Sequence, residues 1–317
     1  SDLDLTEQNK YDWVVLVEDN AIRILSEQIS DEHFFKKIFP TIPFAHRELL
    51  GSKAGLSKLC NTHSLRTPPF AVYTGAEDPL VLATTIGFPV LLKIDKSGGG
   101  RGVFLVNSAA DLVTTFAALS DTNKHNLVFQ KYIVGDNIAS EALYKNKQLL
   151  GFTSAKVLKN LKGEFGISYE RCYFTLPEME PFLTQVGEKL GLDGFVSFTI
   201  MREHGSNCLY LVEADLRPHG WFNLCKFSGL DFSELIKIYL SPGNAQAVVQ
   251  KSTTTIIIPF FSRHLMQALR QKNLKDLSRW IFNRGGYWQF VPWYDRKFFW
   301  SIIMEIIKKR EEIKDFE

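Results

Sequence analysis

The stretch Leu211-Val-Glu-Ala-Asp-Leu-Arg-Pro-His-Gly220 joins an apolar strand pattern to two acids and an arginine. Side chains alternate between the two faces of a strand, so Glu213 and Asp215 share one face and Arg217 continues it. Carboxylate oxygens bind divalent cations, and an arginine fork binds phosphate oxygens. The stretch therefore predicts a metal and phosphate site at the end of a strand. The alternative is an edge strand with solvated charges.

A glycine run upstream predicts a phosphate-binding loop. Phe88–Asp95 has the pattern of a buried strand that carries Lys93, and Ser97-Gly-Gly-Gly-Arg-Gly102 follows at once. Glycines allow positive φ angles and let backbone N–H groups approach an anion, to which Lys93 adds a charge. The lysine precedes the glycines instead of closing them, and the strand-like Val103–Val106 argues against a dinucleotide-binding motif. The alternative is a flexible hairpin turn.

The segment Leu127–Asn137 lies between these two motifs and reads as an apolar strand that runs into a polar connector, with a second strand at Ile138–Tyr144. An amide oxygen can accept a hydrogen bond from an adenine amino group, and an apolar side chain can form a wall beside the ring. The candidates for the adenine and ribose contacts are Gln130, Tyr132, Ile133 and Asn137. Taken alone, the segment is an ordinary strand–turn–strand.

In sequence order, the lysine strand, glycine loop, hinge strand and acidic strand resemble the ATP-grasp superfamily, whose members hold ATP between two α+β subdomains. The stretch 49–59, which contains Lys53, and the stretch Leu65-Arg-Thr-Pro-Pro-Phe70 are similar to that family's first helix and the strand after it. The resemblance covers roughly residues 45–243. It implies a mixed α/β and α+β fold that clasps ATP, with a short N-terminal α/β segment and an aromatic-rich C-terminal extension.

The resemblance implies a role for individual residues in binding the nucleotide. Lys53 and Lys93 contact its phosphates, and the loop Gly98–Gly102 closes over them as part of a mobile lid. Leu211 or Val212 forms part of the adenine floor. The complete set that the resemblance implies for ATP is Lys53, Lys93, Gly98, Gly99, Gly100, Gly102, Gln130, Lys131, Tyr132, Ile133, Asn137 and Leu211.

The resemblance also implies a metal site and catalytic groups. Glu213 and Asp215 hold Mg²⁺ that bridges the ATP phosphates, and Arg217 and Lys93 act on the transferred group. Relatives usually carry another acid at the position of Thr199 and Asn at that of Asp215, so the count of two carboxylates is kept. Magnesium retains several waters, so two acids and the phosphates suffice. Relatives often carry Glu at the positions of Gln130 and Asn137. The amide side chains of this chain keep an acceptor oxygen there.

The acceptor substrate is expected to meet residues 151–180. Lys156 lies in a basic stretch and Arg171 follows a glycine-bearing turn, so either can reach the γ-phosphate or a substrate carboxylate alongside Arg217. The alternative for both is a solvated hairpin with charged faces. His219 is interpreted as part of the pocket wall and not as a base.

The domain organisation predicted from these motifs begins with a short or truncated N-terminal segment at 1–44. It continues with the first part of the core (45–70), the lid (71–129), the large subdomain (130–245) and a C-terminal extension (246–317). Strands are expected at 12–18 and 255–259, and helices at 20–29, 31–38, 109–119, 181–190, 232–240, 264–277 and 298–309. The aromatic stretch 287–294 and the last helix are expected to dock onto the main body; the alternative is a membrane surface or a partner.

Composition and charge narrow the class of protein. The 317 residues are 45% hydrophobic and 23% charged, as in an ordinary globular protein of two or three compact units. A formal net charge of +2 argues against nucleic acid as the main partner. The cysteine spacings predict reduced thiols in a reducing compartment. We expect a cytoplasmic protein, because the sequence shows no signal-peptide pattern and no apolar run of the ~20 residues that span a bilayer.

The leading functional hypothesis is a ligase. ATP phosphorylates a small carboxylate substrate, and an amine attacks the acylphosphate to form an amide or peptide-type bond. Positioning and electrostatic stabilisation carry such catalysis, so no protein nucleophile is needed. The expected cofactors are ATP and Mg²⁺, the expected partners are the carboxylate and amine substrates, and a homodimer is left open. The alternatives are a non-catalytic ATP-binding module, suggested by Thr199, and an ATP-grasp carboxylase or kinase.

Overall fold

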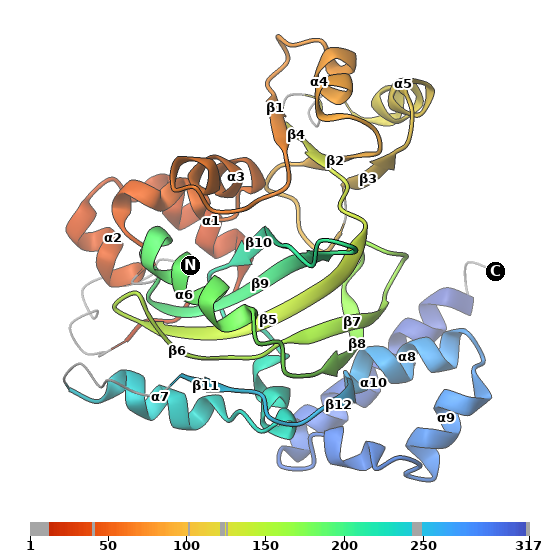
Figure 1. Cartoon of the computed structure of the whole chain (residues 1–317). Coiled ribbons are helices and arrows are strands. Elements are labelled where there is room, and N and C mark those ends of the chain that lie inside the picture. Colours follow the sequence, from red (N-terminus) through yellow and green to blue (C-terminus); the bar gives the residue numbers. More distant parts are fainter. Residues whose placement is uncertain are drawn as a thin grey trace.

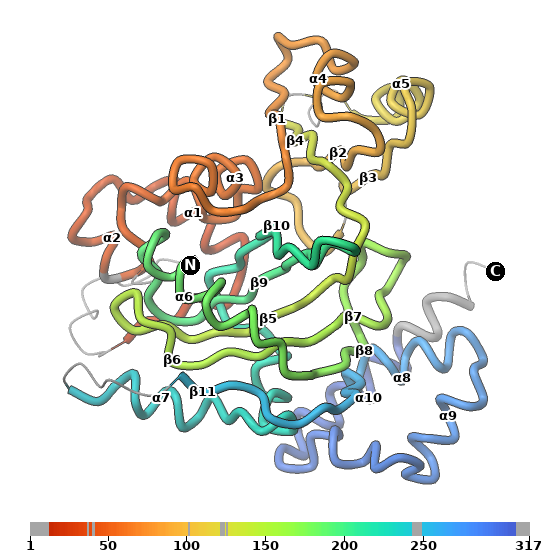
Figure 2. Tube along the Cα trace, in the orientation of Figure 1, coloured from red at the N-terminus to blue at the C-terminus, as the bar shows by residue number. Residues whose placement is uncertain are grey.

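The computed structural model of the protein describes residues 13–39, 42–100, 102–120, 124, 126–242 and 249–314. Two sheets form its body, one of four strands and one of eight. Figure 1 shows the smaller sheet projecting from the top of the molecule, and the blue C-terminal helices at lower right. Figure 2 traces the two connections between the parts, from α3 (Lys53–Thr62) into β1 (Phe70–Tyr73) and from β4 (Leu127–Lys131) into β5 (Gly135–Lys145).

The small sheet has a covered face and an open face. Its other elements are β2 (Val90–Ile94), β3 (Val103–Val106), α4 (Pro79–Ile86) and α5 (Ala109–Ala118). The strands lie in the order β1-β4-β2-β3, and every pair is antiparallel. Leu92 and Phe129 are buried against apolar side chains of both helices. Because side chains alternate along a strand, Lys93 and Gln130 project from the opposite face.

The large sheet is centred on β5, which pairs with β9 along ten residue pairs. Its order is β10-β9-β5-β7-β8-β12, and β6 pairs with both β5 and β11. The strand bounds are β6 (Gln148–Phe152), β7 (Ala155–Asn160), β8 (Ser168–Tyr173), β9 (Gly194–Glu203), β10 (Leu209–Asp215), β11 (Gln250–Lys251) and β12 (Ile256–Pro259). The strand predicted at 255–259 is therefore present as β12, and its pairing with β8 makes the start of the C-terminal extension part of this sheet.

Helices cover one face of the large sheet where it is formed by β5, β6, β9 and β10. They are α1 (Asp19–Gln28), α2 (Glu32–Ile38), α3 and α6 (Met179–Leu190). Their apolar side chains form one core with Ile138, Phe198 and Ile200 of the sheet. As the sequence predicts, α6 ends at Gly191, whose φ of 72° is the left-handed conformation that favours glycine. On the opposite face, α7 (Phe232–Leu240) and the C-terminal extension cover the part formed by β6, β7 and β8.

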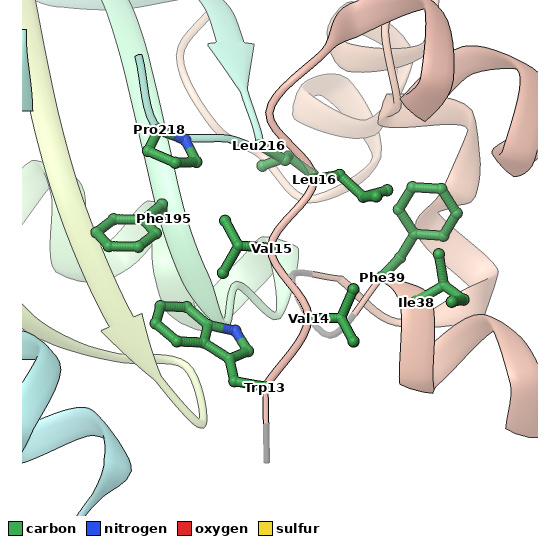
Figure 3. A pocket seen from close by; sticks show the side chains of 9 residues that line it. All are labelled: Trp13, Val14, Val15, Leu16, Ile38, Phe39, Phe195, Leu216 and Pro218. Atoms are coloured by element: carbon green, nitrogen blue, oxygen red, sulfur yellow. The ribbon is translucent and has the colours of Figure 1, made fainter. Parts of the chain in front are cut away.

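The strand predicted at 12–18 is wrong for residues 13–18, which form no strand, and Asp12 lies outside the described residues. Trp13, Val14 and Leu16 of this segment are partly buried by packing and not by a hydrogen-bonded ladder, whereas Val15 and Val17 are exposed. Trp13 stacks on Phe195 with ring centroids 5.2 Å apart. Figure 3 shows the segment lining a small hollow beside Leu216 and Pro218. The hollow is apolar and its volume is about 10 Å³, which leaves room for about one water and excludes a substrate.

The helix predicted at 264–277 is two helices, α8 (Phe261–Arg270) and α9 (Leu274–Ile281). The chain turns between them because Lys272 adopts a left-handed φ of 51° and Asn273 caps α9 by accepting the N–H of Asp276. The last helix, α10 (Arg296–Lys314), buries Ile302 and Ile306 in the core of the large subdomain, so the predicted docking of the tail is confirmed. Within the described residues, every helix is too short or too polar to cross a lipid bilayer.

A buried polar chain joins the extension to the large sheet. Glu170 of β8 lies 3.0 Å from Nε2 of His264 in α8, and Nε1–H of Trp280 in α9 donates to Nδ1 of His264 over 3.1 Å. Lys159 of β7 forms an ion pair with the same Glu170 at 3.2 Å. This arrangement fits the neutral histidine tautomer that carries its proton on Nε2, because Nδ1 accepts a hydrogen bond.

Acid is expected to loosen this docking. Burial by itself raises the pKa of Glu170, but the hydrogen bond from His264 and the charge of Lys159 outweigh it and leave the pKa below its ordinary value of 4.5. A carboxylate with a depressed pKa in the folded state stabilises the fold above its unfolded pKa, and that contribution is lost as the pH falls through the folded value. We expect the melting temperature to fall more steeply below about pH 4.5 in the native protein than in Glu170→Gln. Equal acid slopes for the two proteins would contradict the assignment.

Candidate nucleotide-binding site

Lys93 connects the open face of the small sheet to the large sheet. Its Nζ donates to Oε1 of Gln130 over 2.6 Å, and its side chain is buried. Burial lowers the pKa of Lys93 to about 8; the negative charge of Glu213 opposes this shift and the positive charge of Lys53 adds to it. Since Lys93 lies on β2 and Glu213 on β10, the open face of the small sheet lies near that of the large sheet.

Lys53 is the first residue of α3 and lies beside the glycine loop. Its Nζ donates to the carbonyl oxygen of Ser97 over 2.5 Å. Asp95, at the end of β2, accepts the backbone N–H of Lys53 over 2.7 Å, and the N-cap Ser52 donates its hydroxyl to the same carboxylate over 2.9 Å. A carboxylate at a helix N-terminus is stabilised by the unpaired N–H groups and by the helix dipole. The start of the loop is thereby fixed to the start of α3.

The glycine loop packs on the connection between β7 and β8. Gly100 has a φ of 74°, and a Cβ atom on it would lie 1.9 Å from the carbonyl oxygen of Phe165. A Cβ atom on Gly99 would lie 3.3 Å from Ile167. Nearby, the hydroxyl of Tyr132 donates to Glu164 of the same connection over 2.7 Å. The loop is therefore held against the large subdomain, over the cleft that contains Lys93 and Lys53.

Gly100→Ala is expected to release this loop. The added methyl group meets a backbone oxygen and requires a positive φ, both of which disfavour the observed position. We expect faster amide hydrogen exchange at 97–102 and 161–167. The matched control is Gly98→Ala, because a Cβ atom there meets nothing within 4 Å. Equal exchange in the two variants would show that the loop does not depend on this contact.

The open face of the large sheet carries three rows of side chains across β5, β9 and β10. The rows are Asn137–Met201–Tyr210, Ala139–Thr199–Glu213 and Glu141–Ser197–Asp215. Residues directly opposite each other on antiparallel strands lie on the same face, with Cβ atoms about 5 Å apart. Glu213 and Asp215 therefore share one face, as the strand alternation predicts, and Thr199 lies opposite Glu213.

The two carboxylates suit a magnesium ion that keeps much of its water. Burial and the charge of Glu213 raise the pKa of Asp215 to about 7, against the charges of Arg217 and Lys53. Within the described residues, no third His, Cys, Asp or Glu joins the pair to make a larger metal-binding group. Mg²⁺ is usually bound through one or two carboxylates together with substrate phosphates. The donor set therefore fits Mg²⁺ beside a phosphate chain.

Comparisons with known proteins agree with this geometry. The family model described as the carbamoyl-phosphate synthase L chain, ATP binding domain, matches residues 57–137, which include the second half of α3, the small sheet and the hinge. The solved structure of N5-carboxyaminoimidazole synthetase from Staphylococcus aureus complexed with ADP superimposes with a TM-score of 0.58, at 14% identity, over 83% of this chain and 74% of that one. For D-alanine–D-alanine ligase from Bacillus anthracis, the TM-score is 0.56 at 17% identity, over 76% of this chain and 83% of that one. The chain has the ATP-grasp fold.

The ATP-grasp resemblance and the fold predicted from the sequence are thus confirmed. Among curated proteins, the D-alanine–D-alanine ligase of Ralstonia nicotianae is 22% identical over 221 residues, which are 63% of this chain and 62% of that protein. The chain spans less than two thirds of the length of the first curated relatives it matches, with shares of 62% and 44%.

Leu211 does not lie on the ATP-grasp cleft, which corrects the prediction that it forms an adenine floor. It pairs with Ile200, and both side chains are fully buried in the core on the opposite face of the sheet. A β-bulge at Val212 breaks the two-residue alternation, so Leu211 and Glu213 point to different faces. Met201 is the apolar side chain that lies on the open face, beside Thr199.

Some polar groups of the hinge between the ATP-grasp subdomains form hydrogen bonds within the protein. Nζ of Lys131 donates to the carbonyl oxygens of Gly87 and Phe88 over 2.7 and 3.1 Å, so its ammonium group is used within the small subdomain. The contact of Lys131 with nucleotide stays a prediction. The N–H of Tyr132 donates to Pro89 over 3.3 Å. The N–H of Ile133 has no partner in the described part of the chain, which leaves it available to a ring edge. Gln130 and Asn137 remain predictions for the adenine and ribose.

Arg217 forms an ion pair that the sequence does not reveal. Its Nη2 donates to Oδ2 of Asp19 over 2.7 Å, and its Nε donates to the other oxygen of that carboxylate. Asp19 lies in the first turn of α1, 198 positions away in the sequence. No local motif signals this partner. The pair fixes the guanidinium near Asp215, at the edge of the candidate metal site.

The two predicted substrate residues of the 151–180 stretch lie in different surroundings. Lys156 forms an ion pair with Asp136 at 2.7 Å and is half exposed. Arg171 is buried and donates from Nη1 to Glu141 over 2.7 Å and from Nε to the hydroxyl of Ser168 over 2.9 Å. Lys156 is thus a paired surface group, as in the solvated-hairpin alternative, whereas Arg171 belongs to the interior beside the open face of the sheet.

Proposed function

We propose that this ATP-grasp protein is an ATP-dependent ligase that joins a carboxylate to an amine through an acylphosphate. The observation that supports this most strongly is that the charge of Glu213 on the large sheet acts on the pKa of Lys93 on the small sheet. This interaction brings a phosphate-binding cation and a metal-binding acid to one cleft. Relatives of the chain include D-alanine–D-alanine ligase and phosphoribosylamine–glycine ligase, whose names describe this kind of bond formation.

In the proposed mechanism, the residues of the chain act by stabilising charge. Lys53 and Lys93 neutralise the phosphates. Glu213 and Asp215 would hold Mg²⁺, which would withdraw charge from the phosphate oxygens. A carboxylate oxygen of the substrate attacks the terminal phosphorus, and the bond to ADP breaks. Arg217 stabilises the charge on the transferred phosphoryl group. An amine then attacks the acyl carbon, phosphate leaves, and the amine loses a proton.

The test is ADP release by the purified chain with MgATP and a panel of carboxylates, with hydroxylamine present as the trapping amine. We expect at least one acid to stimulate ADP release and to yield its hydroxamate. Stimulated ADP release without any hydroxamate would argue against an acylphosphate and for a kinase acting on another acceptor. Stimulation and trapping with bicarbonate alone would favour a carboxylase, the chemistry named for the 2-oxoglutarate carboxylase small subunit among the relatives.

The second candidate is a non-catalytic nucleotide-binding module. It is favoured by Thr199, which places a neutral hydroxyl opposite Glu213 where an acid would complete the metal site. The module would be supported over the ligase if calorimetry showed binding of a non-hydrolysable ATP analogue and no acid in the panel stimulated ADP release.

A further inference from the structure

Two arginines from distant parts of the chain meet at Ser168. Arg171 of β8 donates from Nε to the hydroxyl of Ser168 over 2.9 Å, and Arg263 of α8 donates from Nη1 to its carbonyl oxygen over 3.2 Å. Arg171 lies 4.2 Å above the ring of Trp221, and Arg263 lies 4.4 Å above the ring of Phe260. The two rings pack edge to face with centroids 5.2 Å apart. Aromatic packing thus holds two like charges side by side.

The arginine pair has more positive charge than its surroundings neutralise. Glu141 pairs with Arg171 at 2.7 Å and is itself fully buried. Arg263 makes no ion pair with a carboxylate in the described part of the chain. Burial and the charge of Arg171 lower the pKa of Arg263. Arg171 is buried and Arg263 is partly buried. Removing an unpaired guanidinium from water is costly, so an anion that entered here would be favoured.

Two polar side-chain atoms near the pair are buried without a hydrogen-bond partner in the described part of the chain. They are Nδ1 of His219 and the hydroxyl oxygen of Ser197. Burial lowers the pKa of His219 to about 4, and the charges of Glu141, Arg171, Arg217 and Arg263 also act on it, so the ring lies near these groups. Ser197 lies between Glu141 and Asp215 in its row. Buried polar groups normally have partners, so these two point to an absent ligand.

The arginine pair lies at a defined place relative to the metal site. Glu141, which pairs with Arg171, is on β5, and Asp215 is on β10, with only β9 between them. Neighbouring strands are about 4.8 Å apart, so Glu141 and Asp215 are separated by roughly 10 Å. One small molecule can therefore reach both the metal site and the arginine pair.

We propose that the acceptor substrate carries a second anionic group, which binds between Arg171 and Arg263 beside His219, so that α8 of the C-terminal extension completes the acceptor pocket. This rests on the proposed ligase function. The reacting carboxylate lies at Arg217, and the second anion, a carboxylate or a phosphate, lies one substrate length away. Arg263 and Arg171 act here as specificity residues for a dianionic acid.

The test uses the full chain saturated with MgADP. Calorimetric titrations compare the dicarboxylates from malonate to adipate, 3-phosphonopropionate, and butyrate as the matched monoanion. We expect the best dianion to bind at least tenfold more tightly than butyrate, and the two dianion classes separate a carboxylate from a phosphate preference. Arg263→Gln is expected to remove this preference, and Arg263→Lys to keep part of it. The control Arg270→Gln, an exposed residue of the same helix, keeps it fully.

Each outcome decides the proposal. A wild-type protein without dianion preference, or an Arg263→Gln variant that retains it, overturns the acceptor pocket. An unchanged MgADP affinity in Arg263→Gln shows that the variant is folded and that the nucleotide site is intact. If MgADP binds and a monocarboxylate gives hydroxamate but dianions have no advantage, the ligase proposal stands and only this inference fails. Failure of the ligase proposal appears separately, as the absence of any hydroxamate.

Discussion

Replacing Glu213 with Gln is expected to lower the rate of ADP release by about 100- to 1000-fold, the range found when one electrostatic group of a transition-state site is removed. The amide keeps the size of the side chain and an acceptor oxygen but loses the charge. Glu213 is one of two carboxylates on the open face, and Lys93 interacts with it across the cleft. The variant should also lose the magnesium dependence of nucleotide binding, which calorimetry with and without Mg²⁺ measures.

The matched control is Glu234→Gln, an exposed acid on α7 that pairs with Lys237. It removes the same charge from the same chain, far from the cleft, and should leave ADP release unchanged. Undiminished turnover in Glu213→Gln would mean that the metal site has been assigned to the wrong residues.

Arg171→Met is expected to destabilise the fold by about 3–5 kcal/mol, the cost of leaving one partner of a buried ion pair alone. Glu141 is wholly buried and its carboxylate is held by Nη1 of Arg171 at 2.7 Å. Methionine preserves much of the aliphatic volume but none of the charge, so Glu141 is left unpaired in the interior. Urea denaturation followed by tryptophan fluorescence measures the change in the free energy of unfolding.

Two comparison proteins separate charge from packing in this prediction. The double variant Glu141→Leu with Arg171→Met removes both charges and should recover much of the lost stability. Lys237→Met breaks an exposed pair and should have little measurable effect. A double variant as unstable as Arg171→Met alone would show that the arginine stabilises through packing on Trp221 and not through its ion pair.

Local patterns were enough to predict much of the fold. The end of α6 at Gly191 and the alternation that joins Glu213 to Asp215 both depend on neighbours within a few residues, and both are present in the structure. The lysine strand and glycine loop follow from the same kind of short-range signal. Their order along the chain then led to the ATP-grasp fold.

The errors and omissions arise where tertiary structure overrides these patterns. Because of the bulge at Val212, Leu211 and Glu213 point to opposite faces of the sheet, and a period-two pattern does not predict the bulge. The break at Lys272 is hidden because α8 and α9 bury apolar residues in the same core, so their pattern reads as one helix. Asp19, as the partner of Arg217, and Arg263, beside Arg171, are brought to the site only by folding. Residue types alone do not show such contacts.

The central claim is that a nucleoside triphosphate lies between the small sheet and the open face of the large sheet. A crystal structure with a non-hydrolysable ATP analogue and Mg²⁺ tests it most directly. We predict the adenine edge at the N–H of Ile133, the phosphates at Lys53 and Lys93, and the metal on Glu213 and Asp215. A nucleotide bound elsewhere, or a metal ion that contacts neither carboxylate, would contradict the account.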